Sequence, residues 1–503
     1  MKKGGTMFYS ALLLTGANLL LRVVSLGFQV YLSGQIGASG IGLLQLTLSV
    51  SPLAMTAAMG GIRTATMYLT AGRIGRGQGG TGRVLKSCML YSLVCSLSVA
   101  AAVWQGSSWL AEGWIGDGRT LLSIRIFGSF LPVVCMVGVL TGYFTAAGRV
   151  RELVAVEIGE QLLSMGATVL LLHRFAGGDP GRACASVIGG SSAGSLLTLT
   201  VLLILKGKTG KQDKRERVLP ELLKTAVPLA LADDLRMGIS TAENLIVPRR
   251  LGLFSGTSDA LGDYGLVCGM VFPVLMFPAC ILYSLAELLI PELSRCAAGN
   301  RARRIGYLTD RSIRVAMLYG FCAGGVLFTA AEPLGLLLYG DGRVGLLLKA
   351  FSIMAPMLYT DAVVDAAVKG MGQQVACVRY NTLTSFLDVV FLWVLLPKLG
   401  LRGYYLSFAA THLLNFCLSV RRLRKVTGCA LPVGTFWKAT ASAVAGILLC
   451  SFFPKGEGLW SVLALSVAFL AAFLCLLILT GCIGKEDLRW LKGLVRGRLT
   501  EGV

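Results

Sequence analysis

Histidine is the scarcest of the residues that usually carry catalysis or bind metals: His173 and His412 are the only two in 503 residues. The sequence also lacks the G-x-x-x-x-G-K-[ST] motif of ATP-binding loops and the H-E-x-x-H motif of zinc proteases. Its 14 cysteines are scattered singly, with no C-x-x-C pair, so we expect neither a thiolate metal site nor a disulfide framework. We therefore expect a protein that is not an enzyme and that holds no cofactor.

Charged residues are few as well. Only 15% of the residues are charged, 55% are hydrophobic, and the mean hydropathy is +0.71, a composition that excludes a water-soluble protein. The run 462–479 contains no charge and is about long enough to cross a bilayer. The first apolar run, 7–32, is too long for the core of a signal peptide, so we interpret it as a retained first helix.

Acidic residues are outnumbered by basic ones, 26 to 47, which gives a formal net charge of +21. Such an excess can indicate nucleic-acid binding, but the Lys and Arg residues lie mainly in alternate loops, such as 73–86, 206–217 and 301–311. The positive-inside rule assigns these loops to the cytoplasm. The pattern predicts a multi-pass protein of the bacterial cytoplasmic (inner) membrane, with both termini cytoplasmic and no nucleic-acid partner.

The apolar runs predict an all-α polytopic membrane protein with about fourteen transmembrane helices. The first six are expected near 6–33, 41–72, 84–105, 120–147, 152–172 and 183–205, the next six near 221–251, 264–294, 312–331, 344–368, 376–397 and 403–420, and the last two near 433–453 and 459–483.

We divide the chain into an N-terminal lobe (1–206), a basic cytoplasmic linker (207–219), a C-terminal lobe (220–425), two further helices (432–484) and a basic cytoplasmic tail (485–503). Because each lobe has an even number of helices, the two lobes enter the membrane from the same side, as in transporters built from parallel repeats.

Two arginines lie well inside predicted helices, Arg22 in the first and Arg236 in the seventh. An arginine at a helix centre costs about 2.5 to 3.5 kcal/mol on insertion scales, so each needs a water-filled cavity or a partner. We expect both to contact a ligand in a cavity; an ion pair between Arg236 and Asp233, three residues earlier, is the alternative. Arg63, which follows Gly60 and Gly61, is either a cavity residue or an anchor at the membrane surface.

The seventh helix also carries Asp233, Asp234 and Glu243. A polar stripe on an otherwise apolar helix faces water or protein rather than lipid. These residues are therefore candidates for the cavity, and Asp233 and Asp234 are candidates for ion coupling.

Asp361 and Asp365 lie four residues apart on the tenth predicted helix and are followed by Lys369 in the same row. A carboxylate pair in a membrane can carry Na+ or H+, but the same row also makes an ordinary charge ladder. Because no ATP-binding motif is present, we expect any transport to be coupled to Na+, H+ or the membrane potential.

Six segments, in order along nearly the whole chain, resemble the polysaccharide-exporter branch of the multidrug/oligosaccharidyl-lipid/polysaccharide (MOP) exporter superfamily, most of all the stage V sporulation protein B and lipid II flippase families. These segments are 22–37, 40–45, Glu160-Gln161, 243–251, 290–294 and 369–372.

The resemblance implies two six-helix lobes around a central cavity, and alternating access that moves an undecaprenyl-pyrophosphate-linked saccharide, such as lipid II, to the outer leaflet. It implies cavity arginines at Arg22, Arg63 and Arg236, whose planar guanidinium groups suit a pyrophosphate. Gln29 and Glu243 stand where we expect a basic residue and an aspartate in close relatives, and Gln29 makes the cavity less positive. The implied partners are the lipid-linked glycan, the membrane and cell-wall synthesis proteins, with the chain a monomer.

Two other functions stay open. A cation-coupled multidrug exporter of the same superfamily would favour twelve helices and an acidic cavity, and Asp233, Asp234 and Glu243 fit it. A membrane-embedded glycosyltransferase or polymerase would need a sizeable outer loop with catalytic carboxylates, whereas the predicted outer loops are short.

Overall fold

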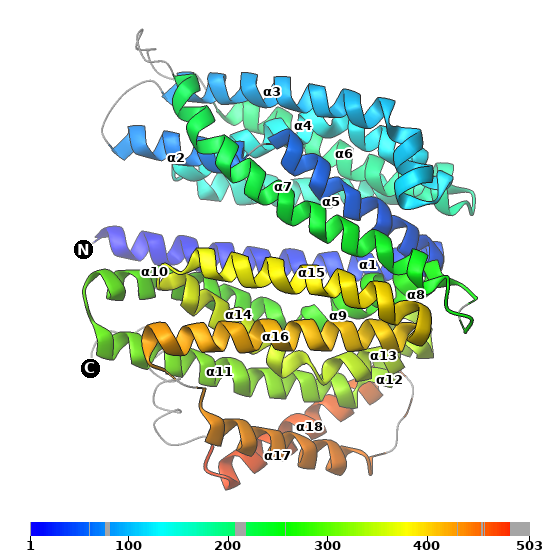
Figure 1. Cartoon of the computed structure of the whole chain (residues 1–503), viewed down its shortest axis with the longest axis vertical. Coiled ribbons are helices and arrows are strands. Elements are labelled where there is room, and N and C mark those ends of the chain that lie inside the picture. The colour runs from blue at the N-terminus through cyan, green and yellow to red at the C-terminus, as the bar shows by residue number, and fades with distance from the viewer. Residues whose placement is uncertain are drawn as a thin grey trace. The chain divides into compact units, whose positions relative to one another are not determined.

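The structure is a computed structural model of the whole chain, and it describes residues 2–59, 61–75, 81–206, 218–256, 258–429, 431–453, 456 and 458–482. Over these residues the chain is helical and contains no strand, which confirms the all-α prediction. The chain divides into two compact units, Met1–Gly265 (unit 1) and Leu266–Val503 (unit 2). Figure 1 shows the helices of both units.

Unit 1 contains eight α-helices, which are connected in places by short π or 3-10 turns. They are α1 (Lys2–Met59), α2 (Ile62–Gly75), α3 (Thr81–Gln105), η1 (Trp109–Ile115), η2 (Gly118–Thr120), α4 (Leu121–Ala146), α5 (Val150–Leu171), η3 (Leu172–Ala176), α6 (Pro180–Leu205), α7 (Val218–Leu251) and α8 (Ala260–Tyr264).

Unit 2 begins within η4 (Gly265–Val271) and ends with two helices that pack on α11. Its helices are α9 (Phe272–Met276), α10 (Ala279–Ala298), α11 (Ala302–Thr329), α12 (Ala331–Tyr339), α13 (Gly342–Ser352), α14 (Ala355–Gly370), α15 (Gln374–Leu399), α16 (Leu401–Thr427), α17 (Val433–Cys450) and α18 (Leu459–Leu479).

Helix α1 is interrupted at Gly37, whose φ of 69° and ψ of 177° are not helical. This region of backbone space is essentially restricted to glycine. At 1.5 Å per residue, an unbroken helix of this length would be far longer than the roughly 30 Å hydrocarbon core. Figure 1 shows the first half of α1 running away from the N-terminus and the second half turning back. Gly37 therefore separates the first two predicted spans.

By length and composition, nine helices of the described chain can cross a membrane, and eleven if each of two bent helix pairs forms one span. The difference from the predicted fourteen has two causes. Residues 20–59 are one of the nine, although Gly37 divides them. Helices α7 and α16, which have 34 and 27 residues, are not among the nine because they are more polar than the other long helices.

Proline explains the first of the two bends, between α9 and α10. The bend there is 62°, and Pro278, the residue before α10, has no backbone N–H to continue the α-helical pattern. Two tyrosines from other helices satisfy carbonyl groups at the break. The Tyr319 hydroxyl donates to the Pro278 carbonyl at 2.8 Å, and the buried Tyr359 hydroxyl donates to the Leu275 carbonyl.

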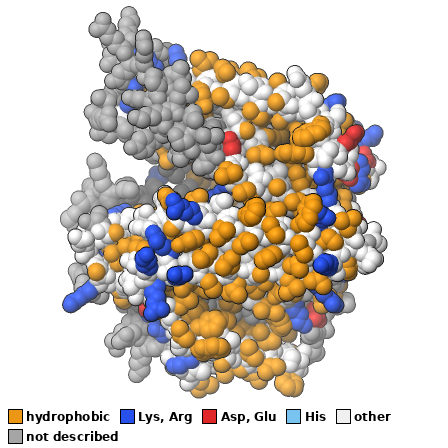
Figure 2. Space-filling model, in the orientation of Figure 1, with side chains coloured by type: hydrophobic (Ala, Val, Ile, Leu, Met, Phe, Trp, Pro, Cys, Tyr) orange, Lys and Arg blue, Asp and Glu red, His pale blue; other side chains and the backbone are white. Residues whose placement is uncertain are grey.

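Each unit has its own apolar core. In unit 1, α2, α3, α4 and α6 enclose Ile62, Leu85, Phe144 and Leu202. In unit 2, Phe469 of α18 packs against the face of α11 that carries Met317 and Phe321. Many other large apolar side chains are exposed, as expected of a protein whose outer surface meets lipid, and Figure 2 shows them over much of the drawn face.

Most helices begin and end within a few residues of the predicted spans. The features that were not predicted include the division of the second span between α1 and α2, the breaks at Pro278 and before α14, the separate short helix α12, and the extensions of α11 back to Ala302 and of α16 on to Thr427. The predicted linker lies almost wholly, and the predicted tail wholly, outside the described residues. The compact units divide after Gly265 because α7 packs on α1, so the lobe boundary at the linker stays a prediction.

Candidate functional site

The candidate residues of α1 lie in its first half. Arg22 is exposed and Gln29 is partly exposed, and both make interactions with neighbouring groups. Ser25, one turn after Arg22, accepts a hydrogen bond of 3.3 Å from the Gln161 side chain of α5. This contact brings the Glu160-Gln161 segment of the resemblance next to the Arg22 segment.

The candidate residues of α7 lie between Asp234 and Glu243. Arg236 is exposed, Glu243 is partly exposed, and Asp234 is partly exposed with one carboxylate oxygen buried and unpartnered. The Asp233 side chain lies outside the described residues, so its ion pair with Arg236 stays a prediction. The buried Thr241 hydroxyl donates to the Ser49 carbonyl at 2.8 Å, which fixes α7 against the second half of α1.

These contacts fix the depth of the arginines in unit 1. Arg22 precedes Gly37 by a rise of about 22 Å along the helix. Ser49 lies about 18 Å beyond Gly37 along the second half of α1, and Thr241 of α7 lies opposite it. Arg236 lies about 7 Å further along α7 in the same direction, which gives about 25 Å from the level of Gly37. Counted as rise along the helices, Arg22 and Arg236 thus lie at similar distances from the level of Gly37.

Arg63 lies elsewhere, one residue into α2 and nearer the end of unit 1 that the basic loops mark as cytoplasmic. Its side chain is exposed, and its positive charge interacts electrostatically with the Glu157 carboxyl group of α5. Its carbonyl oxygen would lie 2.5 Å from a Cβ placed on Gly142, so α2 and α4 approach closely here. Arg63 thus lies on a different helix from Arg22 and Arg236, and its place in the cavity stays a prediction.

Glu160 is held by hydroxyl groups. One carboxylate oxygen accepts a hydrogen bond from Ser195 at 3.1 Å, and the other accepts one from Thr198 at 2.9 Å, both from α6. Gly194 permits this approach, because a Cβ there would meet the Glu160 carbonyl at 3.0 Å. The polar link between α5 and α6 thus positions the segment that carries Gln161.

The acidic pair of α14 separates into two environments. Asp365 pairs with Lys369 at 2.6 Å, as the charge-ladder interpretation predicts. Asp361 instead accepts a hydrogen bond of 3.1 Å from Asn415 of α16. The second oxygen of Asp361 and the amide oxygen of Asn415 are both buried and have no hydrogen-bond partner in the described structure.

Asp388 of α15 was missed by the sequence analysis. Its carboxylate is buried and accepts hydrogen bonds from Ser407 at 2.5 Å and Thr411 at 3.2 Å, both of α16. A lone aspartate between apolar residues gives no periodic signal. The i, i+4 pair of hydroxyl residues in α16 was the only available hint.

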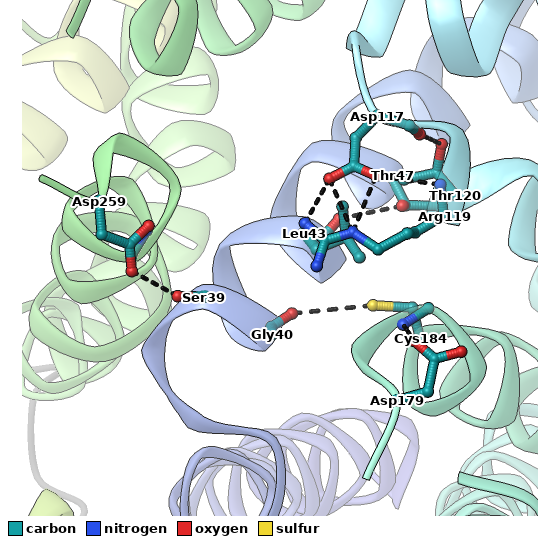
Figure 3. A network of polar contacts seen from close by, with 12 residues as sticks. Ser39, Gly40, Leu43, Thr47, Asp117, Arg119, Thr120, Asp179, Cys184 and Asp259 are labelled. Atoms are coloured by element: carbon teal, nitrogen blue, oxygen red, sulfur yellow. Dashed lines mark hydrogen bonds and ion pairs between the residues drawn. The ribbon is translucent and has the colours of Figure 1, made fainter. Parts of the chain in front are cut away.

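Figure 3 shows a network of polar residues at the end of unit 1 where Gly37 lies. Ser39 donates to Asp259 at 2.5 Å, and the Cys184 thiol donates to the Gly40 carbonyl at 3.7 Å. Asp117, in the α3–α4 connection, pairs with Arg119. Partial burial raises the pKa of Asp117, but hydrogen bonds from Arg119 outweigh it and hold the pKa of this carboxyl below its ordinary value.

Neither a metal centre nor a serine nucleophile emerges from the described residues. No group of three or more His, Cys, Asp or Glu residues in them could hold a metal ion. The sequence 190–194 matches the G-x-S-x-G pattern of serine hydrolases, but it lies inside α6. There Ser192 is buried and donates to the Ile188 carbonyl, whereas a nucleophile needs a sharp strand-to-helix turn.

Comparison of sequences finds relatives of the same length. No protein-family model matches the chain. It is 22% identical over 507 residues to stage V sporulation protein B of Bacillus subtilis, which covers 96% of this chain and 97% of that protein. It is also 23% identical over 441 residues to the uncharacterized membrane protein YabM of the same bacterium, with 80% of each chain covered.

Comparison of structures defines the class of fold. The lipid II flippase MurJ, in an inward closed conformation, matches with a TM-score of 0.71 at 12% identity, over 92% of this chain and 98% of that one. An inward-facing multidrug resistance MATE transporter of the MOP superfamily matches with a TM-score of 0.64 at 14% identity, over 82% and 96%. The chain is a multi-pass membrane protein that shares the fold of these two transporters, and its sequence is similar to stage V sporulation protein B over nearly its whole length.

Proposed function

We propose that this protein is a flippase that moves an undecaprenyl-pyrophosphate-linked saccharide, such as lipid II, from the inner to the outer leaflet by alternating access. The observation that carries the proposal is the pair of exposed arginines in unit 1, Arg22 on α1 and Arg236 on α7, which a count of helical rise puts at similar distances from the level of Gly37. The fold shared with a lipid II flippase and the full-length homology to stage V sporulation protein B support it.

The physical argument concerns where an arginine can be exposed inside a membrane. A guanidinium group that faced hydrocarbon would be costly, so we infer that Arg22 and Arg236 face an aqueous space or polar groups rather than lipid. A pyrophosphate offers several anionic oxygens, and arginine binds such oxygens with two parallel hydrogen bonds where lysine cannot. Gln29 lies two turns from Arg22 and can contact the sugar or the phosphate without adding charge.

We propose that transport is driven by an ion that binds to buried polar residues of unit 2. Asp361 and Asn415 present two buried oxygens without partners, and oxygen ligands of this kind suit Na+, while the carboxylate alone can carry H+. The buried Asp388, held by Ser407 and Thr411, is a second candidate for the coupling ion. Asp365 is a weaker candidate because Lys369 already neutralises it.

The cellular setting follows from the proposed substrate. The positive-inside rule supports cytoplasmic termini, and the proposed substrate is made at the bacterial cytoplasmic membrane, where we therefore propose that the chain acts. The partners are then the lipid-linked glycan and the proteins that make or polymerise it during peptidoglycan or spore-cortex synthesis. The chain acts as a monomer, as a transporter with both lobes in one chain requires no second copy.

A cation-coupled multidrug exporter is the second candidate. Asp234, which has a buried unpartnered oxygen, and the partly exposed Glu243 lie on the same helix as Arg236 and would attract a cationic drug. Shared fold with MATE transporters is consistent with this activity.

A binding panel separates the two candidates. Purified protein in nanodiscs is titrated with lipid II, undecaprenyl phosphate and the cationic dye rhodamine 6G. The proposal predicts the tightest binding for lipid II, weaker binding for the monophosphate and none for the dye. Tighter binding of the dye than of either lipid would reject the flippase and favour drug export.

A further inference from the structure

Two side-chain contacts join the end of α7 and the start of α8 to the rest of unit 1. The first is the hydrogen bond of 2.5 Å from the Ser39 hydroxyl of α1 to the Asp259 carboxylate, shown in Figure 3. The other oxygen of Asp259 accepts the Gly262 backbone N–H at 2.8 Å and so begins α8. One carboxylate thus links the start of α8 to the α1 segment just after Gly37.

The second contact comes from Arg249 in the last turn of α7. Its guanidinium donates to the backbone carbonyls of Gly113 and Trp114 at the end of η1. Gly116, the residue that follows η1, has a φ of 81° and lies so close that a Cβ there would be 3.6 Å from the Arg249 side chain. A cation on the free carbonyls of a helix C-terminus is favourable, so this contact holds α7 against the α3–α4 connection.

Glycines let the same segments approach at backbone distance. A Cβ on Gly42 would lie 2.1 Å from the Leu261 carbonyl, and a Cβ on Gly265 would lie 2.1 Å from the Ala38 carbonyl. The α8 segment is therefore seated directly on α1 next to the break at Gly37. The break supplies a point where α1 can change direction, and the Ser39–Asp259 contact ties α1 just after this point to the start of α8.

We infer that Ser39–Asp259 and Arg249–η1 together form a clasp, which keeps the end of unit 1 near Gly37 closed and must open once in each transport cycle. The clasp is made of polar contacts between the partly exposed Ser39 and the exposed Arg249 and Asp259, and these groups can exchange with water when it opens. An apolar seam would instead expose hydrophobic surface. The positive-inside rule assigns this end to the outer side, so the clasp would control release of the substrate there. This role rests on the proposed transport function.

Hydrogen–deuterium exchange on the full chain in nanodiscs tests the clasp. Ser39→Ala removes the hydroxyl but leaves Asp259 to begin α8, and it should speed exchange in residues 258–265 about fivefold. Arg249→Ala should speed exchange in residues 109–116 by about the same factor. Arg343→Ala is the matched control, because Arg343 lies in unit 2 and pairs with Asp341 at 2.9 Å at the start of its own helix, and it should change neither segment.

Transport by the same proteins tests the gating role. Loss of both contacts favours the open state, and we expect the Ser39→Ala, Arg249→Ala double variant to flip lipid II about threefold more slowly than wild type. Unchanged exchange in both single variants would overturn the clasp. Faster exchange with unchanged flipping would overturn its gating role. If the variants exchange faster but the wild-type protein flips no lipid-linked substrate, the proposed function is rejected. The two contacts would then have a structural role only.

Discussion

Asn415 donates a hydrogen bond of 3.1 Å to one carboxylate oxygen of Asp361, and the other oxygen is buried without a hydrogen-bond partner. Four residues later on the same helix, Asp365 is neutralised by Lys369 at 2.6 Å. Two aspartates with the same sequence pattern therefore differ in what their carboxylates can still bind.

This difference predicts unequal effects of removing the two charges. Asp361→Asn should abolish the dependence of transport on an applied Na+ or H+ gradient, because the replaced group no longer binds the coupling ion. Asp365→Asn should reduce the rate several-fold at most, since it frees Lys369 without removing the ion ligand. Transport is measured in proteoliposomes with each gradient imposed separately. Equal loss of gradient dependence in both variants would count against the assignment to Asp361.

The proposed phosphate contacts predict a graded series at Arg236. Arg236→Ala should weaken lipid II binding about tenfold or more, because a hydrogen bond to a charged group contributes about 1.5 to 3 kcal/mol. Arg236→Lys should recover part of the loss, since lysine keeps the charge but not the bidentate geometry. Arg22→Ala should resemble Arg236→Ala.

Arg182→Ala is the control for this series. Its side chain is 67% exposed and its partner is Asp179 at 3.8 Å, so it should bind lipid II as wild type does. Titration in nanodiscs at fixed salt gives the dissociation constants. If Arg236→Ala and Arg22→Ala bind lipid II as tightly as Arg182→Ala does, neither arginine is part of the binding site.

The break in α1 predicts that Gly37 tolerates no side chain. A Cβ there meets no atom within 4 Å, so the penalty comes from the backbone conformation alone. Gly37→Ala should destabilise the protein by about 1 to 3 kcal/mol. Gly34→Ala, where a Cβ also meets no atom within 4 Å and the backbone is helical, should be neutral or slightly stabilising. Thermal unfolding measures both, and a Gly37→Ala protein as stable as Gly34→Ala would show that the break is not required.

The apolar runs of the sequence predicted most helices, because every segment that crosses a bilayer must be long and apolar enough to do so. It could not predict the bend at Pro278, because prolines at 132 and 291 lie inside continuous helices. A proline breaks a helix only where neighbours satisfy the freed groups, and here Tyr319 and Tyr359 do so from distant helices.

The candidate site was predictable only for charges that stand out in apolar helices. Arg22 and Arg236 were found this way, but their similar depth depends on the contact between Thr241 and Ser49, which no sequence period encodes. Asp361 and Asp365 looked equivalent until Asn415 was placed beside one of them. The buried Asp388 was missed because its two hydroxyl partners lie on the next helix.

The docking of α18 on α11 predicts a strong effect at Gly325. A Cβ there would lie 2.0 Å from the Phe469 ring, which is fully buried. Gly325→Ala should displace α18 and speed hydrogen exchange in residues 433–450 and 459–479. Adding Phe469→Leu should restore part of the protection, because the smaller side chain makes room for the new methyl group. Additive losses in the double variant would mean that these two residues do not meet.

The central claim is that the protein moves a lipid-linked pyrophosphate across a bilayer, and translocation by the wild type tests it most directly. Purified protein is reconstituted into liposomes with fluorescent lipid II in both leaflets, and the fraction of label accessible to a membrane-impermeant quencher is followed in time. The account predicts that protein-containing liposomes give full access within the assay while protein-free liposomes retain about half of the label. The claim is contradicted if liposomes with and without protein give identical traces for lipid II and also for other undecaprenyl-pyrophosphate-linked saccharides.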